Sequence, residues 1–208
     1  VAYGETRDDP QLFEFFCEKN IMGLFVQALQ LGDPDIQTQV IQAISILIQN
    51  ICSVTSLYML LSKDHINRLI DPNLGKWARP GQEGRELEAE GSQAAGMEGM
   101  ELPWADEEFL SHYVALLKAI SVRLSPDTVQ FFLDAFKGSF PLYRRAVPLI
   151  GHADPMVRTC ALSIVLHICS VQDKGVSSFL ALPVNCIPFF TQISGLLQEQ
   201  YSLLLCRV

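Results

Sequence analysis

The sequence predicts an all-α fold, a HEAT- or armadillo-like stack of helix pairs with a disordered acidic insertion. Apolar residues recur with a period of about 3.6 along most of the chain, and strand-like alternation is nearly absent. At four of the expected helix starts a residue with a capping side chain stands directly before proline. One segment differs, because it combines many glycines and glutamates with few apolar residues.

Helices are expected over successive segments of the chain. They cover residues 10–19, 21–31, 34–52, 54–62, 64–71, 105–124, 126–136, 141–150, 155–171, 176–182 and 186–206. The capping residues that precede proline are Asp9, Asp33, Ser125 and Asp154. Their side-chain oxygens can accept an amide hydrogen bond that the first helical turn leaves unpaired. Pro148 is expected to kink or end its helix, and the 186–206 helix is expected to be amphipathic and buried.

Two of these helices match each other. Setting Pro34 on Pro155 places Ile36 on Val157, and the later apolar positions of the two helices also coincide. The shared form resembles the second helix of HEAT and armadillo repeats, in which each helix pair buries its apolar face by stacking on its neighbours.

The insertion divides the helical domain into two parts. Residues 1–71 form its N-terminal part, residues 72–104 the flexible glycine- and glutamate-rich insertion, and residues 105–208 its C-terminal part. Residues 72–108 hold nine acidic and three basic residues, and therefore most of the net charge of −8. A segment so poor in apolar residues cannot offset the entropy lost on ordering, so we expect it to be disordered.

The composition argues against several classes of function. A net charge of −8 argues against a nucleic-acid surface, and no run of apolar residues is long enough for a membrane-spanning helix. Phosphate-binding and nucleophile-elbow motifs are absent, and the four histidines are isolated. We therefore expect no catalytic residue, no cofactor and no metal site. The six cysteines are expected to be buried free thiols, typical of a reducing compartment. Because the chain begins with Val1, we interpret it as a piece of a longer protein.

Two clusters of side chains each leave two interpretations open. A basic cluster could grip an acidic peptide or an anionic lipid headgroup, or form a solvated surface in which Arg158 folds back to Asp154. Its members are Lys137, Arg144, Arg145 and Arg158. An aromatic cluster could line a partner groove or belong to the core, which we favour. Its members are Phe13, Phe15, Phe16 and Phe25.

The sequence resembles the FPL-domain family, whose Phe-Pro-Leu tripeptide is present as Phe140, Pro141 and Leu142. Further blocks resemble the family in the same order, at 13–20, 55–62, 106–118, 128–132 and 155–158. The family includes the Ema-like endosomal trafficking proteins. The resemblance implies a cytoplasmic protein peripherally associated with endosomal, Golgi or lysosomal membranes, which acts in traffic to the lysosome or vacuole and in autophagy.

The expected function is thus a non-catalytic scaffold that binds trafficking proteins. An anionic membrane surface is a further candidate partner, and the sequence does not determine whether membrane contact is direct or indirect. Nothing in the sequence determines the oligomeric state of the chain. One alternative is an adaptor for a ubiquitin ligase, and another is a helical enzyme with an unrecognised site. The candidate partner-binding residues are Phe140, Leu142, Tyr143, Arg144 and Arg145.

Overall fold

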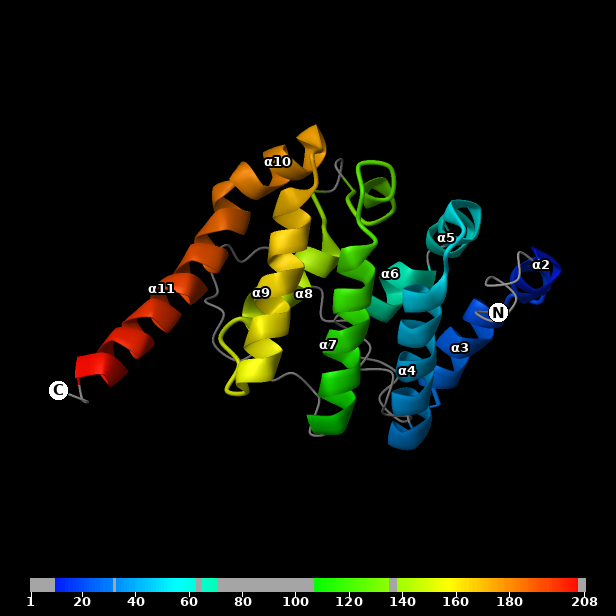
Figure 1. Cartoon of the computed structure of the whole chain (residues 1–208), viewed down its shortest axis with the longest axis horizontal. Helices are drawn as coiled ribbons and strands as arrows, with labels where there is room; N and C mark the ends of the chain where they lie inside the picture. The colour runs from blue at the N-terminus through cyan, green and yellow to red at the C-terminus, as the bar shows by residue number, and fades with distance from the viewer. Residues whose placement is uncertain (1–9, 32, 63–64, 71–106, 135–137, 206–208) are drawn as a thin grey trace, which may run out of the picture.

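The chain folds as a row of packed helices, shown in Figure 1 as a computed structural model. The structure describes residues 10–31, 33–62, 65–70, 107–134 and 138–205. Within these ranges no strand is present, and a single residue bridge joins Asp134 to Ser139. The all-α prediction is confirmed. The described helices are α2 (Pro10–Glu18), α3 (Ile21–Leu29), α4 (Pro34–Asn50), α5 (Val54–Leu61), α6 (His65–Ile70), α7 (Glu107–Val122), the 3₁₀ helix η2 (Val129–Phe131), α8 (Pro141–Leu149), α9 (Pro155–Ser170), α10 (Lys174–Ala181) and α11 (Pro183–Leu205).

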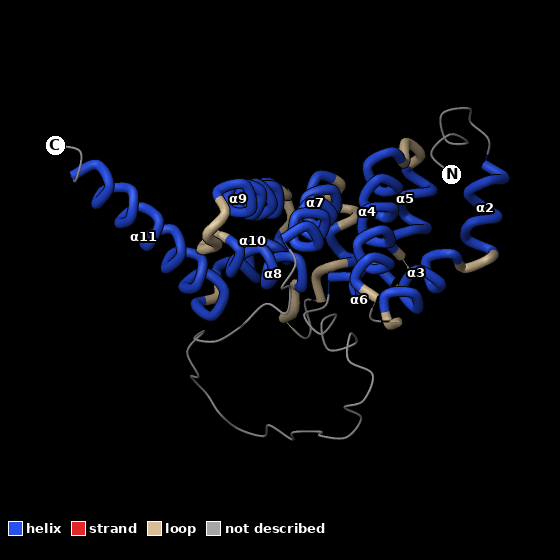
Figure 2. The backbone as a smooth tube through the Cα atoms, turned by 90° about the horizontal axis from the view of Figure 1, so that it is seen from below, coloured by secondary structure: helices blue, strands red, loops and turns tan. Residues whose placement is uncertain are grey.

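The helices form two layers. α4, α7 and α9 lie side by side and run in the same direction (Figure 1). Seen from below, α3, α6 and α8 form a second row against them (Figure 2). One apolar cluster joins the described helices before and after the predicted 72–104 insertion, which itself lies outside the described residues. The more specific armadillo-like stacking stays a prediction.

The helix starts at Asp33 and Asp154 follow the capping prediction. The Asp33 carboxylate accepts hydrogen bonds from the amides of Asp35 and Ile36, at 3.0 and 3.2 Å. Asp154 accepts one from the Met156 amide at 2.8 Å. These bonds satisfy amides that the first helical turn leaves without a partner. Asp173 caps α10 in the same way, so that helix begins at 174 and not at the predicted 176.

The core forms where the apolar faces of the two layers meet. Ile44 of α4 has no exposed surface, and Val165 of α9 is only 2% exposed. Of the N-terminal aromatic cluster, Phe13 and Phe16 are buried with their rings stacked 5.9 Å apart. Phe15 is 55% exposed, so the core assignment is wrong for that ring.

Residues 126–134, the described part of the predicted 126–136 helix, do not form an α-helix. The Ser125 amide donates to the Thr128 hydroxyl at 2.8 Å, and the Thr128 amide donates back to the Ser125 hydroxyl at 3.2 Å. The Thr128 hydroxyl also donates to the Arg123 carbonyl at 2.8 Å. Such local side-chain bonds give the backbone an alternative to helical pairing. The segment therefore makes only the short helix η2 before the bridge at Asp134.

The expectation that 186–206 is a buried helix is also wrong. Asn185 is the only residue of α11 in the buried class, and the helix projects from the row (Figure 1). Its first turn is anchored at Asn185. The Tyr143 hydroxyl donates to the Asn185 carbonyl at 3.0 Å, and the Asn185 side-chain amide donates to the Phe179 carbonyl at 2.8 Å. No single described helix has the length and apolarity to cross a membrane. Among the described helices, only α10 and α11 taken together are long and apolar enough, and these two helices meet at a 70° bend.

Of the described cysteines, Cys52, Cys160, Cys169 and Cys186 are free, as expected, but none of the described cysteines is buried. Cys52 and Cys169 are exposed, and the other three are half-buried. His167 is a hydrogen-bonded helix residue, also as expected, since its Nδ1 lies 2.9 Å from the Ser121 hydroxyl. That contact links α9 to α7.

Candidate interaction surface

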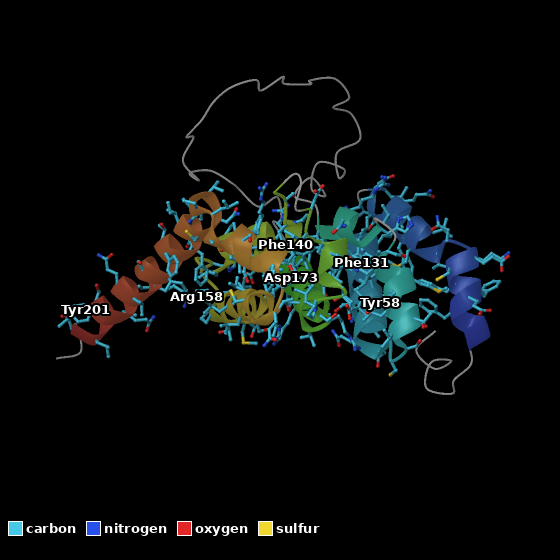
Figure 3. All side chains as sticks on the ribbon, turned by 90° about the horizontal axis from the view of Figure 1, so that it is seen from above. Tyr58, Phe131, Phe140, Arg158, Asp173 and Tyr201 are labelled. Carbon is cyan, nitrogen blue, oxygen red and sulfur yellow. The ribbon has the colours of Figure 1, made fainter. Side chains whose placement is uncertain are left out.

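The Phe-Pro-Leu tripeptide lies at the start of α8 and points into the core. Phe140 precedes the first residue of the helix, and Pro141 occupies the first helical position, where a missing N–H costs nothing. Phe140 and Leu142 have no exposed surface, and Tyr143 is 4% exposed. In Figure 3 Phe140 lies in the middle of the row of helices. These three side chains cannot reach a partner in the folded domain, which corrects their prediction as contact residues.

The two arginines that follow point to different surroundings. Arg145 is 4% exposed and its Nε donates to the Ile70 carbonyl at 3.4 Å, where the Tyr113 hydroxyl also donates at 3.2 Å. Arg145 is therefore a buried cap on the end of α6, and its prediction as a contact is corrected too. Arg144 is exposed, and its Nη2 donates to the Gly138 carbonyl at 2.9 Å. Of the five candidates, only Arg144 stays a predicted surface contact.

The basic cluster predicted from sequence does not hold the expected ion pair. Arg158 donates to the carbonyls of His152 and Ala153, at 3.1 and 3.3 Å, and makes no ion pair with Asp154 in the described part of the chain. Lys137 lies outside the described residues. Arg158 thus closes the loop before α9, which is a structural role.

A groove lies on the open face of the first layer. It has a volume of about 830 Å³ and follows α7 along its side toward α9. Its residues on α7 recur at helical spacing, and the small side chains of Ser111, Ala115 and Ala119 lie at intervals of four along it. Small residues on one helix leave room between neighbouring helices. This spacing was present in the sequence and is the signal that could have predicted the groove.

The groove has an apolar floor and exposed apolar walls. Leu110, Val114 and Val157 are buried at its base. Val122 and Met156 line it and are 60% and 72% exposed. Large apolar side chains that face water inside a hollow are typical of a binding surface.

Charged groups lie along the rim of the groove. Lys118 is exposed, whereas Arg123 is fixed by bonds to the Ile48 and Gln49 carbonyls, at 3.1 and 2.6 Å. Glu107 and Asp154 add two carboxylates. The arrangement suits a partner segment with apolar side chains and charges of both signs.

The described residues form no metal site, and the strongly shifted pKa belongs to a phenol outside the groove. Among the described residues, no group of three or more His, Cys, Asp or Glu side chains could hold a metal ion. Burial raises the pKa of Tyr143 to about 12, with smaller contributions from Cys169 and Cys186, but this phenol lies in the core beside Phe179. The groove has an apolar centre and polar rims, an arrangement also found in interfaces between proteins.

Comparisons with known proteins connect the chain to one family. The FPL family, described as an uncharacterised conserved protein, matches residues 1–169. The Arabidopsis thaliana protein transparent testa 9 is 28% identical over 204 residues, covering 96% of this chain and 21% of that protein. The Drosophila melanogaster CLEC16A homolog is 27% identical over 93% of this chain and 16% of its own length. Human CLEC16A is 27% identical over 90% of this chain and 15% of its own. No solved structure matches significantly.

Proposed function

The chain belongs to the FPL family, and on that premise we propose that it is a non-catalytic protein-interaction scaffold in endomembrane trafficking and autophagy. Its place would be the cytoplasmic face of endosomal, Golgi or lysosomal membranes, on routes to the lysosome or vacuole. The chain spans between 15% and 21% of the length of the relatives described above. The proposal therefore concerns the part of such a protein that this chain represents.

The observation that carries the proposal is the α7–α9 groove. The sixteen residues of α7 extend over roughly 24 Å, which matches about four turns of a partner helix. Helix-in-groove recognition uses apolar anchors spaced three and four residues apart. Val122 and Met156 would contact those anchors, and Lys118 would pair with a carboxylate of the partner at the rim. We propose an amphipathic helix of a trafficking protein as the bound segment.

Proximity labelling in cells tests both the partner class and the surface. We expect the wild-type protein to enrich endosomal, Golgi and lysosomal fusion proteins, and Met156→Glu to lose this enrichment. Leu166→Glu is the matched control, because Leu166 lies on the same helix, is 67% exposed and does not line the groove. Equal labelling by all three proteins would refute the groove as the contact.

The identity of the labelled proteins separates the functional alternatives. Enrichment without any endomembrane protein would refute the trafficking role. Enrichment dominated by ubiquitin-ligase subunits would favour the adaptor function instead.

Contact with an anionic membrane is a separate part of the proposal and has its own test. A double charge reversal of Arg144 and Arg145 is unsuitable as a test of membrane binding, because Arg145 is buried and its replacement would disturb the core. Arg144→Glu alone keeps the core intact, since only an exposed bond to the Gly138 carbonyl is lost. We expect it to weaken flotation of the chain with phosphatidylserine vesicles. Unchanged flotation would show that Arg144 belongs to a solvated surface that does not bind the membrane.

A further inference from the structure

One face of α11 carries a regular apolar seam that nothing in the structure covers. Its positions alternate at spacings of three and four residues, the pattern of a coiled-coil contact. We call it the α11 seam, and it consists of Ile187, Phe190, Ser194, Leu197, Tyr201 and Leu204. The five large side chains are between 60% and 66% exposed. In Figure 3 Tyr201 lies at the far end of α11, clear of the other helices.

The charge of α11 narrows the choice of occupant. Glu199 is the only charged residue in its 23 residues. Helices that lie on a lipid surface carry Lys and Arg on their polar face, and α11 has none. A strongly charged partner would find no complementary group either. The seam therefore suits another apolar helix surface.

The seam is complementary to itself when reversed. Turning the helix end for end about the Gly195–Leu196 peptide exchanges three pairs of seam positions. These pairs are Ile187 with Leu204, Phe190 with Tyr201, and Ser194 with Leu197. An antiparallel pair of α11 helices would thus place aromatic against aromatic and a small residue against a large one.

We propose that a second copy of this chain docks on the α11 seam, giving an antiparallel two-fold dimer. This inference goes beyond the scaffold function and does not depend on it. A parallel pair is disfavoured, because it would set Ser194 against its own copy and leave a void there. It would also bring the two Glu199 side chains to the same level, whereas the antiparallel pair separates them by roughly 10 Å along the axis.

The available area is sufficient for a reversible dimer. The five large seam side chains expose on the order of 600–700 Å² per copy. A stable interface of standard size buries about 800 Å² per partner. Thr191 and Gln198 flank the seam and line the same shallow hollow. With their exposed surface added, the area available on each copy comes close to that of a standard interface. We therefore expect association in the micromolar range.

Sedimentation equilibrium of the 208-residue chain over a range of concentrations tests the dimer. We expect a monomer–dimer equilibrium for the wild type, and a dissociation constant raised at least about ten-fold by Leu197→Glu. Leu166→Glu is the control, since the two leucines are 66% and 67% exposed but only Leu197 lies on the seam. Far-UV circular dichroism checks that each variant is folded. A wild type that stays monomeric, or a Leu197→Glu variant that still dimerises as the wild type does, would overturn the proposal.

A residue exchange tests the antiparallel register. Ser194→Leu alone should weaken the dimer by crowding, and Leu197→Ser alone by leaving a void. The double variant restores one small and one large residue at each contact, so we expect it to regain most of the wild-type affinity. If Ser194→Leu strengthens the dimer, the register is parallel and the proposed arrangement is wrong. If the wild type binds vesicles through the seam as a monomer, a lipid surface is the occupant instead.

Discussion

Replacing the Tyr143 phenol by Phe should change the stability of the domain in opposite directions at neutral and alkaline pH. The Tyr143 side chain is 4% exposed, and its hydroxyl donates to the Asn185 carbonyl at 3.0 Å. Its ring packs edge-on against Phe179, with centroids 5.7 Å apart. Tyr143→Phe keeps the ring and removes one hydrogen bond between neutral groups. We expect a loss of about 1 kcal/mol at neutral pH.

At alkaline pH the ionisation of the phenol reverses this difference. Burial raises the pKa of Tyr143 from its usual value of 10.0 to about 12. Between these values the unfolded chain releases the phenol proton and the folded chain keeps it, so the free energy of unfolding of the wild type falls as pH rises. Two pKa units correspond to at most about 2.7 kcal/mol, half of it lost by about pH 11. The Phe variant has no phenol, so its free energy of unfolding does not fall for this reason. Its stability should equal that of the wild type near about pH 11 and exceed it above.

The assay is urea unfolding followed by far-UV circular dichroism at several pH values from neutral to about pH 12. Ile44→Val is the control, because it removes one buried methyl group from α4 and keeps the titrating phenol and its ring contact with Phe179. Its destabilisation should stay constant with pH. A Tyr143→Phe difference that is also constant with pH would refute the reasoning, since the phenol proton would then not distinguish folded from unfolded chain.

Three further substitutions test the packing and the helix ends. Ile44→Asp should abolish folding by burying an unpaired charge, whereas Ile46→Asp should melt cooperatively, because Ile44 has no exposed surface and Ile46 is 50% exposed. Arg123→Ala should cost about 1–2 kcal/mol in urea unfolding, since its Nη2 donates to the Gln49 carbonyl at the end of α4; a loss near zero would contradict this. Asp154→Ala should lower the free energy of unfolding by about 1 kcal/mol, and Asp154→Asn by much less, as measured by calorimetry.

The sequence was most informative where the helix signals are local. Residues Pro34 and Pro155 begin their helices as predicted, because an aspartate cap followed by proline is determined by adjacent residues alone. The same signal at Ser125 predicted a helix that does not form. There Thr128 closes a hydrogen-bonded loop with Ser125, and the chain leaves the helical path. A capping residue can therefore begin a turn as well as a helix, and the adjacent residues alone do not distinguish the two.

Burial was harder to predict than helix position, and most of the site errors come from it. Arg145 carries a charge, which favours an exposed position, yet it is buried against the Ile70 carbonyl. The reverse holds for Phe190 and Leu197, which are apolar and face water on α11. Whether a helix face is covered depends on the neighbouring helix, which hydrophobic periodicity does not identify. The groove between α7 and α9 depends on that packing for the same reason.

The Phe-Pro-Leu tripeptide that carries the family resemblance is therefore a marker of the fold. It does not mark the surface that contacts a partner protein. Phe140 and Leu142 have no exposed surface, and Pro141 sets the first turn of α8. A motif of this kind can recur in proteins that bind different partners, because its side chains hold helices together. Binding specificity has to lie in side chains that reach the solvent, such as Met156 in the groove and Leu197 on the seam. If this is correct, Phe140→Ala should unfold the domain, whereas Met156→Glu should leave its melting temperature nearly unchanged and remove a partner. Loss of binding without unfolding in Phe140→Ala would instead show that the tripeptide acts as a contact.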